Sequence, residues 1–305
     1  MVVGLRTKVI NFLMRHTVKP LLRRQGAEID LIRRRMGADA SKVKALPEGI
    51  ECSVHEIDGL KLERISPKLS TGTRALLYFH GGGYVLGASP GHRDLAAGLA
   101  EMADLTVFLV DYRLAPEHPF PAAVDDALLA YQWLLNQGFE SSQVIIGGDS
   151  AGGGLAVSAL LNIKNLGLTG PAAAMLLSPW LDLSLSGASV EANEHADVVL
   201  SKSVLAAWAD HYLQGRDALA PLASPIYGDL VGLPPVLVHV GSTEILRSDS
   251  EDLVDRIIEH DGSAVLKVWD DLPHVFQVLS GGLPEAKASR KLLADYCAQQ
   301  LQSKP

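Results

Sequence analysis

Short runs of apolar residues recur along most of this chain. Six such runs carry few polar residues and predict strands buried on both faces, as in a parallel sheet. The stretches between them place apolar residues at helical spacing. Strands that alternate with helices predict a doubly wound α/β sheet. The predicted strands are 74–80, 106–112, 144–149, 173–179, 235–241 and 264–270, and the predicted helices lie near 91–103, 121–137, 151–165, 249–261 and 285–301.

Two segments near the N-terminus follow other patterns. Residues 5–45 show helical spacing of apolar residues and predict two or three helices. Residues 50–57 and 60–66 alternate between apolar and polar positions, and Asp58-Gly59 lies between them. This dipeptide between two alternating runs predicts an antiparallel β-hairpin that precedes the parallel strands.

One interval is much longer than a crossover helix requires. Residues 180–234 contain an acidic, Ser-rich stretch, a predicted helix at 202–214 and a Pro-rich loop. Long insertions on α/β sheets often build the walls of a site, so we expect this segment and the N-terminal helices to form a lid. We therefore predict cap helices over 1–48 and an α/β domain over 49–305 with a cap insertion at about 181–234.

Charge and cysteine content limit the classes of partner. The 305 residues carry a net charge of -8, which argues against a nucleic-acid partner. Residues 1–44 hold eleven Lys and Arg against three Asp and Glu. We interpret this basic stretch as a solvated helical face, with docking on a membrane surface or an anionic partner as the alternative. The longest apolar runs are shorter than a membrane span, so we expect no stable membrane insertion.

The spacing of the cysteines and histidines predicts neither a disulfide framework nor a metal site. Cys52 and Cys297 cannot form a disulfide framework, and the chain is expected to be a reduced, cytoplasmic protein. The histidines show no metal-ligand spacing, so no metal site is predicted.

A candidate nucleophile lies where the strand at 144–149 meets the helix at 151–165. The residues Gly148-Asp149-Ser150-Ala151-Gly152 match the pattern G-x-S-x-G. On a strand–turn–helix, this pattern holds the serine in strained backbone geometry, and the two glycines let strand and helix approach closely. The sequence predicts Ser150 as a nucleophile. An ordinary N-cap serine on a glycine-rich turn is the alternative.

A serine hydroxyl needs a base to accept its proton, and a carboxylate to orient that base. For this type of nucleophile the chain order is serine, acid, histidine. His274 follows the last predicted strand and is the predicted base, and Glu244 is the first carboxylate after the strand 235–241. Asp249 is the alternative acid, although it also fits the start of a helix. The other downstream histidines are interpreted as core, helix or insertion residues: His195, His211, His239 and His260.

Three glycines leave the first strand of the parallel set, in the order His80-Gly81-Gly82-Gly83. Such a run costs backbone entropy, so it needs a reason. Attack on an ester carbonyl places negative charge on oxygen, and unobstructed backbone N–H groups can stabilise that charge. We predict an oxyanion hole from the N–H groups of Gly81, Gly82 and Ala151. Gly83 would support the turn and His80 would anchor the loop by a side-chain hydrogen bond, and a glycine loop without chemical use is the alternative.

Five motifs resemble those of the bacterial hormone-sensitive-lipase family of α/β-hydrolases. They occur in that family's order over roughly 74–280, and they read HGGGYVLG, DYRLAPEHPFPAAVDDA, GDSAGGGLA, SPWLDL and LPHVF. The resemblance implies an α/β-hydrolase core of about eight mostly parallel strands and a helical cap. It also implies candidate cis bonds at Ala115-Pro116 and Phe120-Pro121, and a possible homodimer through the last strand. The family's usual acid motif is Asp-Pro-Leu, whereas this chain has Glu244-Ile245-Leu246, a substitution that some relatives share.

The resemblance implies a serine carboxylesterase for short-chain acyl esters, with Ser150 as nucleophile, His274 as base and no cofactor. The expected partner is a small-molecule ester, and the size of its pocket should depend on the cap around Phe12, Trp180 and Trp208. An amidase or peptidase with the same catalytic residues is an alternative. A ligand-binding receptor on this fold, or a lipase that docks on membranes through its basic N-terminal helices, are others.

Overall fold

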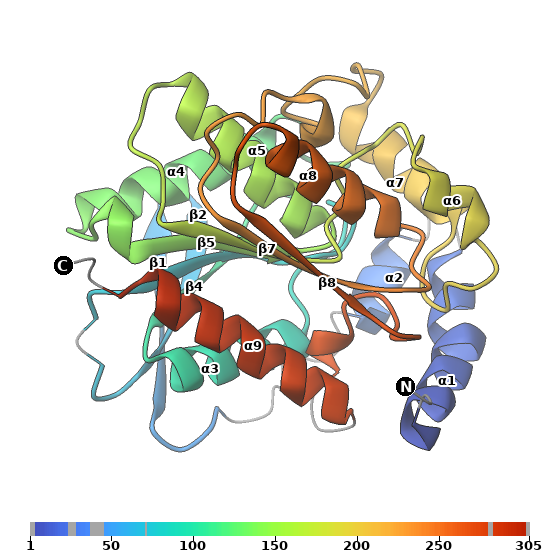
Figure 1. Cartoon of the computed structure of the whole chain (residues 1–305), viewed down its shortest axis with the longest axis horizontal. Coiled ribbons are helices and arrows are strands. Elements are labelled where there is room, and N and C mark those ends of the chain that lie inside the picture. Colours follow the sequence, from blue (N-terminus) through green and yellow to red (C-terminus); the bar gives the residue numbers. More distant parts are fainter. Residues whose placement is uncertain (1–3, 24–28, 37–45, 71, 280–282, 303–305) are drawn as a thin grey trace.

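The computed structural model describes residues 4–23, 29–36, 46–70, 72–279 and 283–302. Its eight-stranded sheet has the order β1-β2-β4-β3-β5-β6-β7-β8 and runs through the middle of the molecule (Figure 1). β1 and β2 form the predicted antiparallel hairpin, and the neighbours from β4 to β8 pair in parallel. The strands are β1 (Ile50–Ile57), β2 (Leu60–Pro67), β3 (Ala75–Phe79), β4 (Thr106–Asp111), β5 (Val144–Asp149), β6 (Ala173–Leu177), β7 (Val236–Gly241) and β8 (Ala264–Trp269).

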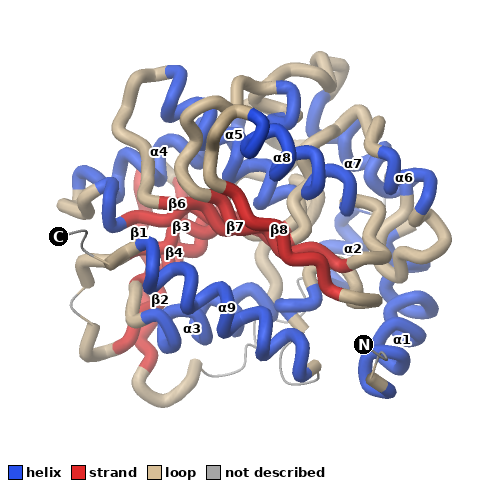
Figure 2. Tube along the Cα trace, in the orientation of Figure 1, coloured by secondary structure: helices blue, strands red, loops and turns tan. Residues whose placement is uncertain are grey.

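Helices cover both faces of this sheet. α3 and α9 pack together on one face, and α4, α5 and α8 lie on the other (Figure 2). The remaining four, α1, α2, α6 and α7, gather at the side where β7 and β8 end (Figure 1). The helices are α1 (Leu5–Leu22), α2 (Ile29–Met36), α3 (Pro90–Ala103), α4 (Ala122–Asn136), α5 (Ala151–Asn165), α6 (Ala188–Ala192), α7 (Lys202–Leu213), α8 (Arg247–Glu259) and α9 (Pro284–Gln300).

The α/β-hydrolase fold predicted from the sequence is confirmed, with element ends that differ by at most two residues from those expected. A third N-terminal helix, which the pattern over 5–45 allowed, would fall on residues 37–45, outside the described residues. Both candidate cis bonds, Ala115–Pro116 and Phe120–Pro121, are cis. β8 differs from a strand buried on both faces, because it lies at the edge of the sheet and leaves Val265 57% exposed.

The parallel strands bring the predicted site residues to one edge of the sheet. Gly81 follows β3, Ser150 follows β5, Glu244 follows β7 and His274 follows β8. The carboxyl ends of parallel strands point to the same side, and ligands of open α/β sheets bind there. β3, β5 and β7 are buried along their whole length, so the loops that leave them start from fixed positions.

Candidate active site

The turn that carries Ser150 is held rigidly between β5 and α5. Ser150 has φ 53° and ψ -124°, a strained conformation for a residue other than glycine. Its N–H donates to the carbonyl of Leu177 at 2.9 Å, and its carbonyl accepts the N–H of Trp180 at 2.9 Å. A Cβ on Gly148 would overlap the carbonyl oxygen of Gly152, so the close approach of strand and helix requires glycine there. The predicted sharp bend is therefore present.

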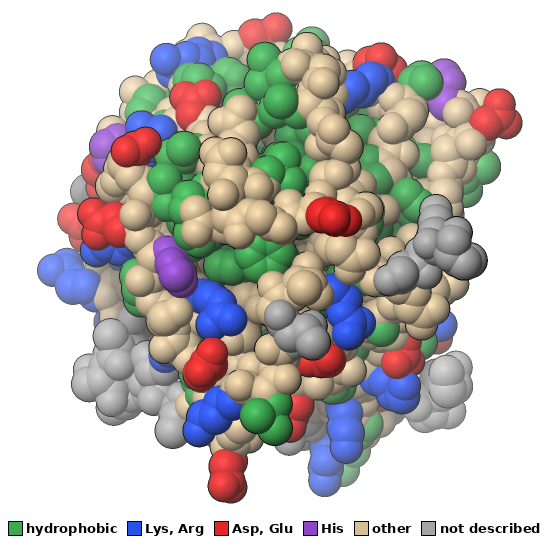
Figure 3. All heavy atoms as spheres, turned by 90° about the vertical axis from the view of Figure 1, so that its left-hand side faces the viewer, with side chains coloured by type: hydrophobic (Ala, Val, Ile, Leu, Met, Phe, Trp, Pro, Cys, Tyr) green, Lys and Arg blue, Asp and Glu red, His purple; other side chains and the backbone are tan. Residues whose placement is uncertain are grey.

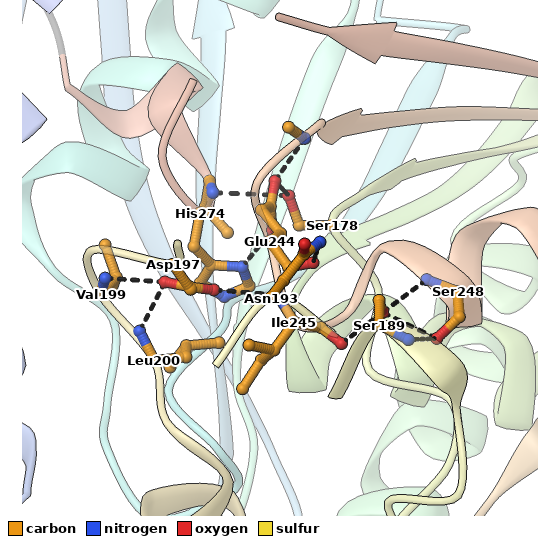
Figure 4. Close-up of polar contacts among 12 residues, drawn as sticks. Ser178, Ser189, Asn193, Asp197, Val199, Leu200, Glu244, Ile245, Ser248 and His274 are labelled. Atoms are coloured by element: carbon orange, nitrogen blue, oxygen red, sulfur yellow. Dashed lines mark hydrogen bonds and ion pairs between the residues drawn. The ribbon is translucent and has the colours of Figure 1, made fainter. Parts of the chain in front are cut away.

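His274 and Glu244 form a direct buried pair (Figure 4). The Nδ1–H of His274 donates to Glu244 Oε2 at 2.6 Å. Glu244 Oε1 accepts the Ser178 hydroxyl at 2.7 Å and the Gly241 N–H at 2.5 Å, which fixes the carboxylate. With Nδ1 donating, Nε2 of the neutral ring is left as the acceptor. This is the tautomer that a general base needs.

The pKa of His274 results from two opposed effects. Burial disfavours the charged ring and lowers the pKa, but the hydrogen bond and negative charge of Glu244 outweigh burial and raise the pKa overall. Asp197 and Asp149 act in the same direction as Glu244. The surroundings of His274 therefore stabilise the imidazolium that forms when the ring takes a proton.

Asp197 is a second buried carboxylate beside this pair (Figure 4), and the sequence did not reveal it. Its Oδ2 accepts the N–H of Ile245 at 3.0 Å, and its Oδ1 accepts the N–H groups of Val199 and Leu200 at 2.7 and 2.8 Å. Burial raises the pKa of Asp197, whereas the nearby His274 lowers it. The residue lies in the acidic insertion, where a carboxylate is ordinarily solvated, so its neighbours in sequence gave no signal.

Ser178 and Asn193 also hold Glu244, and neither was predicted to do so. Asn193 donates through Nδ2 to the Glu244 carbonyl at 2.8 Å, and Ser178 donates to the Glu244 carboxylate. Ser178 directly follows β6, and a polar side chain at the carboxyl end of a parallel strand is the signal that could have identified it. Asn193 has no such marker.

The glycine loop after β3 is shaped by close neighbours. A Cβ on Gly81 would overlap the Asp149 carboxylate, and one on Gly83 would overlap the Trp208 ring. Gly82 has φ +122° and Gly83 φ +62°, both in the region that favours glycine. The N–H groups of Gly81, Gly82 and Ala151 donate no hydrogen bond to another described residue, so they are available to a ligand.

His80 lies beneath this loop with its ring buried. Its Nδ1–H donates to the Gly81 carbonyl at 2.8 Å, and its ring stacks on Tyr112 at 4.4 Å between centroids. Burial lowers the pKa of His80 to about 4, with a further contribution from the charge of His92. A neutral, enclosed ring fits the anchoring role expected from the sequence and has no access to a reacting group.

Ser150 and His274 lie on the wall of one cavity of about 600 Å³. No hydrogen bond joins these two side chains among the described residues. In unliganded sites such contacts are often long, and they tighten when substrate binds. Gly81 and Gly82 line the same cavity. Its walls are mostly apolar and include Leu22, Leu86, Leu114, Leu200, Trp208 and Val278.

The cap was expected to determine the size of the pocket around three aromatic residues, and these three lie in different surroundings. Trp208 lines the cavity, but Phe12 is 62% exposed on α1 and does not reach it. Trp180 is fully buried and donates through Nε1 to the Asp182 carbonyl at 2.9 Å. The sequence could not separate these cases, because an aromatic residue looks the same whether it faces a pocket, the core or solvent.

The alternative residues have structural roles. His239 lies inside β7 and pairs with the Ser289 hydroxyl at 2.8 Å, and burial lowers the pKa of His239 to about 4. Asp249 accepts the N–H groups of Leu181 and Asp182 at 2.8 and 3.1 Å. Burial raises the pKa of Asp249 to about 8. Neither His239 nor Asp249 lines the cavity. The other three downstream histidines do not line it either: His195, His211 and His260.

Two negative findings concern only the described residues. Among them, no group of three or more His, Cys, Asp or Glu side chains is arranged to hold a metal ion. In the same part of the chain, no helix combines the length and apolar character that a membrane span requires.

Comparison with known proteins identifies the family of this chain. Residues 76–278 match a family model described as having the alpha/beta hydrolase fold. An acetyl-hydrolase of Streptomyces hygroscopicus is 43% identical over 214 residues, which cover 70% of this chain and 72% of the relative. An esterase of Acinetobacter venetianus is 38% identical over 242 residues, which cover 78% of each chain.

A solved structure agrees over nearly the whole chain. It is a crystal structure of an esterase from the bacterial hormone-sensitive lipase family, with a TM-score of 0.91 and 37% sequence identity. The similarity covers 99% of this chain and all of that one. The family model, the relatives and this structure agree with the motifs and the fold, and the chain belongs to the hormone-sensitive-lipase family of α/β-hydrolase esterases.

Proposed function

We propose that this esterase hydrolyses short-chain acyl esters through an acyl-enzyme on Ser150. His274 acts as general base and acid, and Glu244 holds its ring. Gly81, Gly82 and Ala151 donate the N–H groups of the oxyanion hole. The observation that carries the proposal is that His274, bound through Nδ1 to the buried Glu244 carboxylate, lines the same cavity as Ser150.

The reaction has two acyl transfers. Ser150 Oγ attacks the ester carbonyl while His274 Nε2 takes the hydroxyl proton, and the charge on the carbonyl oxygen is stabilised by the three N–H groups. The bond to the alcohol oxygen breaks, and His274 returns its proton to the leaving alcohol. Water then attacks the acyl-enzyme while His274 takes a proton from it. The bond to Ser150 Oγ breaks, His274 gives its proton back to that oxygen, and the carboxylic acid is released.

The electrostatics of the cavity support this division of roles. Fixed N–H donors in a water-poor site stabilise an oxyanion strongly, and the loss of one such donor costs about 10²–10³ in rate. The dipole of α5 favours negative charge at its N-terminus, where Ser150 and Ala151 lie. The carboxylate of Glu244 favours the positive imidazolium. Both charges that develop in the transition state therefore have a partner.

The preference for short acyl chains is supported by the acetyl-hydrolase relative and by the enclosing Trp208 ring. Trp208 packs against the backbone of Gly83, one residue from the proposed donors. A bulky ring at that distance limits how far an acyl chain can extend on its side of the cavity. A rate series across acyl chains of increasing length tests this: activity should fall as the chain grows beyond the cavity, and equal rates for long chains would contradict the preference.

The decisive experiment compares Ser150→Ala with Ser158→Ala. Ser158 is a buried serine on α5 whose hydroxyl has no hydrogen-bond partner among the described residues, so it is a matched control. We expect Ser150→Ala to lower kcat for p-nitrophenyl butyrate by about 10⁶ with an unchanged far-UV spectrum. Ser158→Ala should keep its activity. Near-normal turnover by the Ser150 variant would refute the proposed nucleophile.

A further inference from the structure

The outer face of α1 carries an exposed apolar stripe. Leu5, Val9, Phe12 and Leu13 are 80%, 51%, 62% and 51% exposed. Residues four, seven and eight positions apart lie on one side of a helix, so these side chains form a single surface. Soluble proteins commonly expose single apolar residues, but four on one helix face form a patch that calls for a partner.

The side chains that hold α1 to the protein lie along one flank of the stripe and behind it. Asn11 donates to the Asp271 carbonyl at 2.8 Å, and Lys19 donates through Nζ to the Asp197 carbonyl at 2.7 Å. Arg15 also docks here, through the carbonyl groups of residues 195 and 196. These contacts fix the rotation of the helix about its axis. The apolar stripe is therefore turned to solvent by the way α1 is anchored.

The charge of α1 is opposite to that of the whole protein. The helix contains Arg6, Lys8, Arg15 and Lys19 but no Asp or Glu, whereas the net charge of the chain is -8. The short helix α2 adds the three consecutive cations of residues 33–35. The face opposite to α1 shows Lys and Arg interspersed with Asp and Glu (Figure 3). Two of the α1 cations bind backbone carbonyls of the protein, whereas Arg6 and Lys8 are exposed beside the stripe.

We propose that the outer face of α1 docks on an anionic lipid surface. The apolar stripe would enter the boundary between headgroups and acyl chains, and Arg6 and Lys8 would meet the anionic headgroups. A helix with apolar side chains on one side and Lys and Arg beside them is suited to lie in such an interface. A second copy of this chain fits less well, because pairing two α1 faces would bring two cationic helices together.

Docking through α1 would also place the cavity near the lipid surface. Leu22, the last residue of α1, lines the cavity that holds Ser150. A protein held by α1 therefore keeps that cavity close to the lipid surface, where esters of low water solubility accumulate. The docking itself needs no catalysis, so its test is independent of the proposed esterase mechanism.

The test is co-sedimentation of the full chain with phosphatidylcholine vesicles that contain about one third phosphatidylserine, and with phosphatidylcholine vesicles alone. The variant Phe12→Ser/Leu13→Ser removes two exposed side chains of the stripe. The control Leu166→Ser/Leu219→Ser removes two leucines that are 55% and 50% exposed elsewhere. Turnover of p-nitrophenyl butyrate in free solution is measured for every variant, to show that each is folded.

We expect the wild type and the control to bind anionic vesicles and the stripe variant to bind about 10²-fold more weakly. Binding should also fall in about 0.5 M NaCl and on vesicles without anionic lipid. Unchanged binding by the stripe variant would overturn the proposal, as would equal binding to both kinds of vesicle. Sedimentation equilibrium tests whether a second copy of the chain covers the stripe instead. If the wild type is a dimer that does not bind vesicles, and the stripe variant is a monomer, the stripe is a dimer contact and the proposal is wrong.

Discussion

Replacing each of two buried carboxylates by an amide should show which of them acts as the catalytic acid. Glu244 and Asp249 both follow β7, and both are nearly inaccessible to solvent. Glu244→Gln and Asp249→Asn keep the shape of each side chain and remove its charge. Each substitution therefore keeps the size of its own side chain, and both sites are buried and follow the same strand. The two sites differ in the groups that each carboxylate contacts.

The contacts of Glu244 determine how a glutamine would sit. Its Oε1 accepts the N–H of Gly241 at 2.5 Å, and this donor cannot reverse its role. The amide oxygen of glutamine must therefore occupy that position, which turns the NH₂ group toward His274 Nδ1. His274 must then accept at Nδ1 and carry its proton on Nε2, where it cannot take a proton from Ser150. The corresponding substitution in a serine protease lowers kcat about 10⁴-fold, or about 5.5 kcal/mol of barrier.

Asp249 should respond differently. Its carboxylate accepts two backbone N–H groups, and the pKa near 8 means that it is largely protonated at neutral pH. Asparagine is neutral as well and keeps one oxygen for both donors. We therefore expect Asp249→Asn to stay within about threefold of wild-type kcat for p-nitrophenyl butyrate at pH 7. A loss of several orders of magnitude in this variant, with Glu244→Gln active, would show that Asp249 is the acid.

Three further perturbations follow from individual contacts. Gly83→Ala should lower the free energy of unfolding by about 1–3 kcal/mol in urea titrations, because the new Cβ meets Trp208 at a positive φ. Asp197→Asn should move the acidic limb of the pH profile of kcat/KM to lower pH, because the Asp197 charge raises the pKa of His274 and the base must be neutral; an unmoved limb would contradict this. Between the unfolded pKa of 3.8 and the folded pKa of about 8, Asp249 holds a proton only in the folded state. The free energy of unfolding of the wild type should therefore fall by about 1.4 kcal/mol per pH unit in this window, relative to Asp249→Asn. Parallel curves of unfolding free energy against pH, from urea titrations of the two proteins, would refute this.

The sequence predicted the sheet well because its signals are local. Continuous apolar runs identify strands buried on both faces, and α5 begins and ends where the helical spacing placed it, over Ala151–Asn165. Strand ends were less certain, since an apolar residue can continue past the last ladder hydrogen bond, as Tyr112 does after β4. Exposure at the edge could not be read either, because Val265 looks like any other strand valine.

The site was predictable where a motif fixes the backbone and not where contacts cross long loops. Ser150 and the glycine run lie on turns whose residue types are set by geometry. Asp197, by contrast, reaches Ile245 across 48 positions, out of a segment that sequence alone describes only as acidic and polar. Such a contact depends on how the insertion folds back over the sheet, and no local pattern encodes that path.

The N-terminal helices α1 and α2 also contact residues next to the candidate site, each at a different place. Lys19 of α1 donates to the carbonyl of Asp197, whose carboxylate holds the residue that follows Glu244. Arg33 of α2 donates through Nε to the Val85 carbonyl at 2.7 Å, in the loop that carries the glycine run. Because these two links start from separate helices, a shift of α1 would disturb the surroundings of Glu244, and a shift of α2 would disturb the glycine loop. Substitutions in the cap should thus alter kcat even where they leave the cavity wall intact.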